Sequence, residues 1–324
     1  MKRGLVIGNF CPLHRGHLAL IRFAAGHCDE LIVSMSYRPG DPIDPALRIS
    51  WISETVKDNP IIKPQMVLDD FDDETLPFPE RMSIWADFIK KRYPKIDLLF
   101  SSEAYGEHFG TALEVPHFAF VKEKGQEAVS ASLIRERPFQ HWEDIPEIVR
   151  PYFVKKICLY GAECTGKTTL ARRLAEVYNT EFVPEVAQEI ITSNDFSVED
   201  IIKIGHAQTE RVFEKTKASN KVLFCDTDLI TTEIYSDHYL QQVPPILYEL
   251  EKQVKYDLYF LLDIDVPWVP DGLRNLGHLR EVMHQKFKSA LEERKIPFVE
   301  VRGNFEERER FVRERVDRLL KNSA

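Results

Sequence analysis

The sequence has no run of roughly 18 apolar residues, no excess of positive charge and no paired cysteines. The first absence argues against a membrane-spanning helix, and the N-terminus also lacks the apolar region of a signal peptide. A formal net charge of −9 gives no support to a role that depends on broad attraction to nucleic acid or membranes. The five cysteines form no CxxC pair, and this pattern is typical of reduced thiols in a cytoplasmic enzyme.

The length and composition of the chain predict two globular domains of ordinary size. The chain has 324 residues, of which 44% are hydrophobic and 29% charged, as is typical of soluble globular proteins. Two short apolar runs, Leu5–Ile7 and Lys156–Tyr160, each precede a glycine-containing loop and then a helical pattern. We therefore expect each half to open as strand, phosphate-binding loop and helix, the beginning of an α/β domain.

Further apolar runs alternate with helical patterns in both halves. Strands are predicted at residues 30–35, 97–101, 117–121, 221–225, 258–262 and 298–301. Helices are predicted at residues 46–56, 80–92, 198–217, 246–253 and 279–294. This alternation predicts an α/β fold class with two doubly wound parallel sheets. A segment rich in proline and aromatic residues, 138–153, is predicted to be a packed connector, which gives domains 1–150 and 151–324.

The first loop, GNFCPLHRGH at residues 8–17, carries two histidines that flank a glycine. It resembles the HxGH loop of nucleotidylyltransferases. The glycine lets the backbone approach a phosphate, and the following helix N-terminus adds oriented N–H groups and a partial positive charge. The residues that we expect to bind ATP here are Gly8, Asn9, Phe10, His14, Gly16 and His17.

A second segment, residues 129–135, resembles the ISxTxxR element that completes nucleotidylyltransferase sites. Ser132 is predicted to cap a helix and Arg135 to lie in its first turn, where a cation is unfavourable unless an anion lies opposite. The chemistry implied is nucleotidyl transfer, in which a substrate phosphate attacks the α-phosphorus of ATP and pyrophosphate leaves. His14 and His17 would contact the reacting phosphates, while Ser132 and Arg135 hold the pyrophosphate.

The second loop is a complete P-loop, because GAECTGKT follows a predicted strand and opens a predicted helix. Its backbone N–H groups are expected to surround the phosphates, with Lys167 reaching the β and γ oxygens and Thr168 holding Mg²⁺. The expected ATP contacts are Gly161, Ala162, Glu163, Cys164, Thr165, Gly166, Lys167, Thr168 and Thr169.

Two segments are candidates for binding the phosphate acceptor. Asp226 and Asp228 follow an apolar strand, so one could orient or deprotonate a hydroxyl while the other holds Mg²⁺; the alternative is that they cap a loop or form a turn. We favour Asp226 for the metal-side or base role. The later segment that holds Trp268, Asp271 and Arg274 has the composition of a small closing lid. Trp268 is expected either to stack on a heteroaromatic ring or to pack in the core.

One acidic stretch, DDFDDE at residues 69–74, belongs to neither phosphate loop. It does not have the spacing of an EF-hand calcium loop, which needs a central glycine and a closing glutamate. Two interpretations remain open for it. The stretch is either a solvated surface loop or a mobile flap beside the first site.

The ordered combination of these motifs, over essentially the whole chain, resembles the bifunctional nicotinamide-nucleotide adenylyltransferase and ribosylnicotinamide kinase family (NadR-like). The resemblance implies a Rossmann-like nucleotidylyltransferase domain followed by a P-loop kinase domain. The kinase would phosphorylate ribosylnicotinamide with ATP and Mg²⁺, and the first domain would join the resulting nicotinamide mononucleotide to AMP, giving NAD. Trp85 falls in a segment similar to one that lines the mononucleotide pocket.

The resemblance implies small-molecule partners and no nucleic acid or membrane, with a homo-oligomer left open. Some members carry an extra N-terminal DNA-binding module, which we do not expect here because the sequence opens almost directly with a strand. Relatives often have Asp and Arg where this chain has residues 122–126 (KEKGQ), and tend to have Arg at the position of Gln188. Rival interpretations are another vitamin-derived nucleotide as substrate, or a nucleotide-sensing regulator with little turnover.

Overall fold

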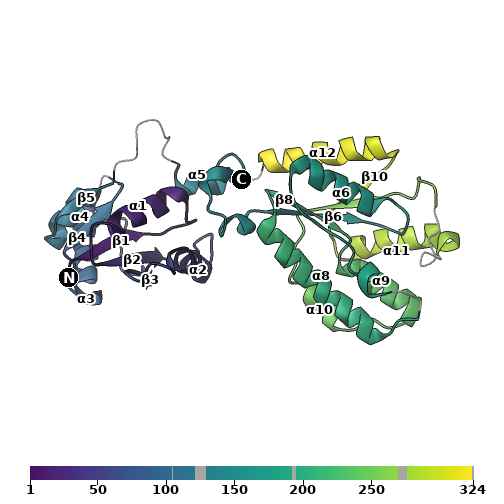
Figure 1. Cartoon of the computed structure of the whole chain (residues 1–324), viewed down its shortest axis with the longest axis horizontal. Helices are drawn as coiled ribbons and strands as arrows, with labels where there is room; N and C mark the ends of the chain where they lie inside the picture. The colour runs from purple at the N-terminus through teal and green to yellow at the C-terminus, as the bar shows by residue number, and fades with distance from the viewer. Residues whose placement is uncertain (104, 121–128, 192–194, 269–275, 323–324) are drawn as a thin grey trace. The chain divides into compact units, whose positions relative to one another are not determined.

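The computed structural model describes residues 1–103, 105–120, 129–191, 195–268 and 276–322 (Figure 1). Contacts divide the chain into two compact units, residues 1–149 and residues 150–322. Among the described residues, no helix is long and apolar enough to cross a membrane.

The first unit is built on a parallel sheet with strand order β3-β2-β1-β4-β5. Its strands are β1 (Arg3–Gly8), β2 (Glu30–Tyr37), β3 (Ile62–Leu68), β4 (Leu98–Ser101) and β5 (His117–Ala119). Its helices are α1 (Arg15–Ala25), α2 (Pro45–Val56), α3 (Phe78–Arg92), α4 (Tyr105–Leu113), α5 (Ala131–Glu136) and the short 3₁₀ helix η1 (Trp142–Asp144). Leu5 on the central strand packs with Ile89 of α3 and Phe109 of α4 in one buried cluster. These two helices therefore cover one face of the sheet.

The second unit is built on another five-stranded parallel sheet, of order β10-β9-β6-β8-β7. Its strands are β6 (Lys155–Tyr160), β7 (Phe182–Val183), β8 (Val222–Asp226), β9 (Leu258–Leu262) and β10 (Phe298–Val301). Its helices are α6 (Lys167–Tyr178), α7 (Ala187–Ile190), α8 (Val198–Ala218), α9 (Leu229–Leu240), α10 (Ile246–Glu251), α11 (Arg280–Glu293) and α12 (Phe305–Asn322), with 3₁₀ helices η2 (Arg150–Tyr152) and η3 (Gly277–Leu279).

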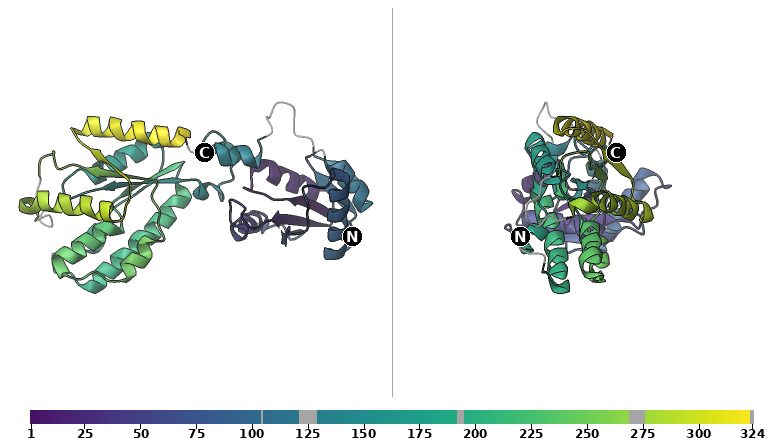
Figure 2. Two further views of the ribbon diagram at one scale, coloured as in Figure 1. Left: turned by 180° about the vertical axis from the view of Figure 1, so that it is seen from behind. Right: turned by 90° about the vertical axis from the view of Figure 1, so that its right-hand side faces the viewer.

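Alternate residues of the central strand β6 face opposite layers of helices. Ile157 and Leu159 belong to a buried cluster with residues of α6 and α12. Cys158 and Tyr160 belong to a second cluster with residues of α9 and α11. Figure 2 shows the same division, with α6 and the yellow α12 on one side of the sheet and α11 on the other. A strand buried on both faces must be apolar throughout, which explains its sequence.

The predicted fold class, two parallel α/β sheets, is confirmed. Elements that the sequence analysis did not predict are β3, β7, α4, α7, α9 and α12. The prediction that Ser132 caps a helix is wrong, because α5 begins at Ala131 and its cap lies two residues earlier. The cap is Ser130, whose extended backbone lets its hydroxyl accept a hydrogen bond from the Leu133 N–H at 3.1 Å. Arg135 consequently lies in the last turn of α5, where the helix dipole favours a cation.

Candidate active sites

The first loop connects β1 to α1, and its two histidines form a reciprocal hydrogen-bonded cap at the start of α1. His14 is the N-cap of α1, and its Nδ1 accepts a hydrogen bond from the His17 N–H at 3.3 Å. In return, Nδ1 of His17 accepts from the His14 N–H at 3.4 Å, and the two rings stack with centroids 3.6 Å apart. Because both Nδ1 atoms are acceptors, each neutral ring carries its proton on Nε2. The cap thus orients two N–H donors side by side.

Beside this loop lies a polar cavity of about 380 Å³. Its walls include four of the predicted ATP-binding residues, Gly8, Asn9, Phe10 and His17. Trp85 lines the same cavity from α3, only 8% exposed, with Phe71 edge-on to its ring at 4.8 Å. Residues far apart in sequence therefore meet at one site.

The predicted pyrophosphate residues reach this loop from α5. The Arg135 guanidinium donates hydrogen bonds to the carbonyl of Cys11 and, at 3.1 Å, to the hydroxyl of Ser132. Neither side chain is among the residues that line the cavity. In this structure Arg135 supports the backbone of the histidine loop. Residues 122–126, where the sequence departs from its relatives, lie outside the described part of the chain.

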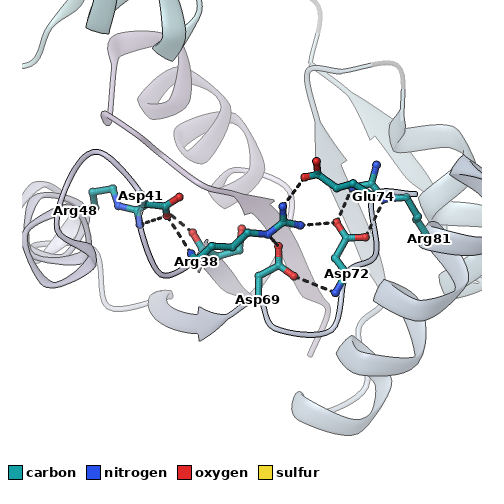
Figure 3. A network of polar contacts seen from close by, with 8 residues as sticks. Arg38, Asp41, Arg48, Asp69, Asp72, Glu74 and Arg81 are labelled. Atoms are coloured by element: carbon teal, nitrogen blue, oxygen red, sulfur yellow. Dashed lines mark hydrogen bonds and ion pairs between the residues drawn. The ribbon is translucent and has the colours of Figure 1, made fainter. Parts of the chain in front are cut away.

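The acidic stretch 69–74 contributes three carboxylate side chains to the walls of this cavity. Figure 3 shows the polar contacts of these side chains. Arg38 donates to Asp69 at 2.8 Å, to Asp72 at 3.1 Å and also to Glu74. Arg81 of α3 forms a bidentate pair with Asp72 at 2.8 and 2.6 Å, and this pair lowers the pKa of Asp72. Burial raises the pKa of Asp69 despite its contact with Arg38. Of the two interpretations of this stretch, its position beside the first site is the one that the structure supports.

A buried arginine that the sequence analysis missed fixes the start of the same loop. Arg48 of α2 is fully buried and donates to the Asn9 carbonyl at 2.7 Å and to Asp41 at 2.6 Å (Figure 3). Its position 39 residues from Asn9 explains why no local pattern indicated it.

The P-loop of the second unit connects β6 to α6 with backbone torsions that favour glycine. Gly161 has a φ of 137°, and a Cβ there would lie 2.9 Å from the Leu262 carbonyl oxygen. The ammonium group of Lys167 donates to the carbonyls of Gly161 and Ala162 at 2.8 and 2.9 Å. Thr168 donates to Oδ2 of Asp226, which ends β8, at 2.5 Å. The loop, the lysine and one carboxylate therefore form one group.

Two arginines from later in the chain donate hydrogen bonds to backbone carbonyls of this loop, and neither was predicted for that role. Arg308 of α12, only 2% exposed, donates to the Thr165 carbonyl at 2.6 Å and the Asp263 carbonyl at 2.9 Å. Arg280, at the start of α11, donates to the Cys164 carbonyl at 3.2 Å.

The two predicted acceptor aspartates have different surroundings. Asp226 contacts Thr168 of the loop, whereas Asp228 caps α9. The carboxylate of Asp228 accepts from the Thr231 N–H at 3.1 Å and from the Tyr259 hydroxyl at 2.8 Å. Asp228 thus caps α9 and is not among the residues that line the P-loop cavity. Its contact with substrate stays a prediction.

The cavity beside the P-loop has a volume of about 450 Å³. It is lined by loop residues 163–169 and by side chains of α8 and α9. Trp268 is not among the residues that line this cavity. It packs against Gly277 and beside Tyr235, as expected if the tryptophan belongs to the core. Asp271 and Arg274 lie outside the described part of the chain. Gln188 lines the cavity and donates to Glu185 at 2.7 Å.

Two α/β units that each place a phosphate-binding loop beside a cavity define a two-domain nucleotide-binding enzyme. Residues 156–308 match the protein-family model described as AAA domain. Over 334 residues the chain is 34% identical to the trifunctional NAD biosynthesis/regulator protein NadR of Escherichia coli (strain K12), covering 92% of this chain and 78% of that protein. The chain belongs to the NadR family.

Two further similarities agree with this assignment. The chain is 24% identical over 172 residues to the nicotinamide-nucleotide adenylyltransferase of Pyrococcus furiosus, covering 48% of this chain and 85% of that protein. A crystal structure of a NadR protein in complex with NAD and AMP-PNP superposes with a TM-score of 0.80 at 21% identity, covering 99% of this chain and 96% of that one. At that identity the superposition shows a shared fold.

We predict that Arg308→Met destabilises the second unit by about 2–4 kcal/mol, because buried carbonyls lose a charged donor. Urea unfolding with a probe in that unit measures the change. The matched control is Arg313→Met on the same helix, whose side chain is 46% exposed. Equal stability of the two variants would contradict a role for Arg308 in holding the loop.

We also predict a pH-dependent effect of Asp228→Asn. Burial raises the pKa of Asp228 to about 6 from its usual 3.8, so the folded state takes up this proton more readily than the unfolded state. The extra proton binding of the folded state adds to the free energy of unfolding below about pH 4. This contribution, about 3 kcal/mol, is lost as the pH rises to about 6. Asparagine removes that slope but can still accept the capping hydrogen bond. Denaturation from pH 4 to 7 should therefore show a flatter profile than wild type.

The control for this experiment is Asp237→Asn, since Asp237 lies on the same helix with its side chain 61% exposed. A profile for Asp228→Asn as steep as that of the control would show that this carboxyl group does not titrate in the range.

Proposed function

We propose that this chain is a bifunctional enzyme of NAD biosynthesis. The domain formed by residues 151–324 phosphorylates ribosylnicotinamide with ATP, giving nicotinamide mononucleotide. The domain formed by residues 1–150 then joins this product to AMP from a second ATP, giving NAD and pyrophosphate. One observation carries the proposal: a reciprocal histidine cap beside a cavity and a complete P-loop beside another occur in one chain of the NadR family.

In the first domain, catalysis would depend on orientation and on stabilisation of charge. The Nε2–H groups of His14 and His17 would donate to the α- and β-phosphate oxygens as negative charge develops there. Arg135 and Ser132 would hold the departing pyrophosphate, which requires the guanidinium to exchange its contact with the Cys11 carbonyl for phosphate oxygens. The nicotinamide ring would stack on Trp85 at the other side of the cavity.

In the second domain, a ribose hydroxyl would attack the γ-phosphorus of ATP. Lys167 would move from its loop carbonyls to the β and γ oxygens, while backbone N–H groups of residues 161–169 bind the remaining oxygens. Asp226 would act as the base or on the metal side.

The donor set at the mouth of this loop fits Mg²⁺, because the Thr168 hydroxyl and the Asp226 carboxylate bring two oxygen atoms within 2.5 Å. Among the described residues no group of three or more His, Cys, Asp or Glu side chains could hold a metal alone. Mg²⁺ would therefore share its coordination with ATP and water, and when bound it neutralises charge on the phosphates. Thr168 and Asp226 would hold it.

We predict that the two activities separate in single variants of the full chain. Supplied with ribosylnicotinamide, ATP and Mg²⁺, His17→Ala should accumulate nicotinamide mononucleotide, with adenylyl transfer reduced at least about 100-fold. Lys167→Ala should form no mononucleotide, yet it should convert supplied nicotinamide mononucleotide to NAD at the wild-type rate. Chromatography of the products measures both reactions.

Each variant serves as the folding control for the other, because each should retain one full activity. Loss of both activities in a folded His17→Ala variant would contradict separate sites. Failure of the wild-type chain to form mononucleotide from ribosylnicotinamide would reject the proposed kinase.

A further inference from the structure

The P-loop cavity has a wall that a phosphate site alone does not require. Away from the loop, three aromatic side chains, Phe196, Tyr235 and Tyr239, line it. The Tyr235 and Tyr239 rings lie nearly parallel with centroids 6.4 Å apart, and Phe196 meets Tyr239 edge-on at 5.5 Å. Such a wall suits a flat ring.

The same cavity has more negative than positive side chains. Among the described lining residues Lys167 is the only cation, and its ammonium group is directed to two carbonyls of its own loop. Glu163 and Glu185 provide two carboxylates. Burial raises the pKa of Tyr235, and the charges of both carboxylates raise it further. The nearby cation Arg211 is paired with Glu189 at 3.1 Å.

An amide side chain adds a hydrogen-bond donor to this wall. Gln208 of α8 is 3% exposed, and its Oε1 accepts from the Val186 N–H at 3.0 Å. Its Nε2 has no partner among the described residues. Leaving a buried donor without an acceptor costs about 1–3 kcal/mol. Gln208 also borders a void of about 10 Å³, which has room for one water at most.

We propose that Glu185 and Gln208 make this cavity select a ribosylated pyridinium amide over the corresponding pyridinium acid. The inference rests on the proposed kinase function and names the feature of the substrate that the site recognises. The amide carries the fixed positive charge of its ring, and its NH₂ group can donate to the Glu185 carboxylate. Its carbonyl oxygen can accept from Gln208. In the acid, a carboxylate cancels the ring charge, cannot donate and faces Glu185 with like charge.

The two side chains have different parts in this selection. A carbonyl or carboxylate oxygen can accept from Gln208 in either compound, so Gln208 fixes the ring without discriminating. Glu185 attracts the amide and repels the acid, so it supplies the discrimination. Gln188 keeps Glu185 in place through its hydrogen bond at 2.7 Å without neutralising the charge.

The test compares kcat/KM of the full chain for ribosylnicotinamide and for ribosylnicotinate, with saturating ATP and Mg²⁺. The wild type should prefer the amide at least about tenfold, and Glu185→Gln should lower this ratio about tenfold or more. Glu185→Asp, which keeps the charge, should preserve the preference. Glu189→Gln is the matched control, because Glu189 lies one turn further on, outside the cavity walls.

Gln208→Leu should raise KM for both ribosides about tenfold, leaving their ratio and the KM for ATP unchanged. Unchanged KM values would show that water in the small void satisfies Nε2 and would overturn the role of Gln208. Equal loss of both substrates in a folded Glu185→Gln variant would overturn the role of Glu185. A wild type that phosphorylates both ribosides equally rejects the selection but keeps the kinase, whereas one that phosphorylates neither rejects the kinase itself.

Discussion

Parallel pairing on both sides of a central strand is the constraint on which each site depends. Because β1 pairs with β2 and β4, and β6 with β8 and β9, the carboxyl ends of neighbouring strands meet at one edge. At this edge Arg38 follows β2 in the first unit and Asp226 ends β8 in the second. The phosphate loops leave the central strands at the same edge. Residues separated widely in sequence can therefore act on one phosphate chain.

Two buried arginines hold the phosphate loops, and neither is among the described residues that line the two cavities. Arg48 donates to a carbonyl of the histidine loop, and Arg308 donates to a carbonyl of the P-loop. Each arginine is also paired with a carboxylate, Asp41 or Asp265. A buried guanidinium with several acceptors avoids most of the cost of removing its charge from water. Each arginine thus fixes one backbone carbonyl of its phosphate loop.

Patterns within short stretches of sequence predicted most of the strands and both phosphate loops. Strands 258–262 and 298–301 were predicted from short apolar runs, and each phosphate loop from an apolar run followed by a glycine-containing loop. The edge strand β3 was not predicted because it contains Pro64 and buries only Ile62 and Val67. Helix α12 buries only Arg308, Val312 and Val316, every fourth residue of a highly charged segment. The supporting arginines and the capping role of Asp228 depend on partners that no local pattern specifies.

The position of Arg308 has a consequence for the order in which the protein is made. Its contact with the Thr165 carbonyl spans 143 residues, so the P-loop waits for nearly the whole second unit to be synthesised before its shape is complete. The contact of Arg135 with the histidine loop, by contrast, lies within the first unit. On the ribosome, where N-terminal domains fold first, the adenylyl-transfer site can therefore mature while the kinase site is still unfinished. The active site that acts second on the metabolite is therefore the one that can fold first.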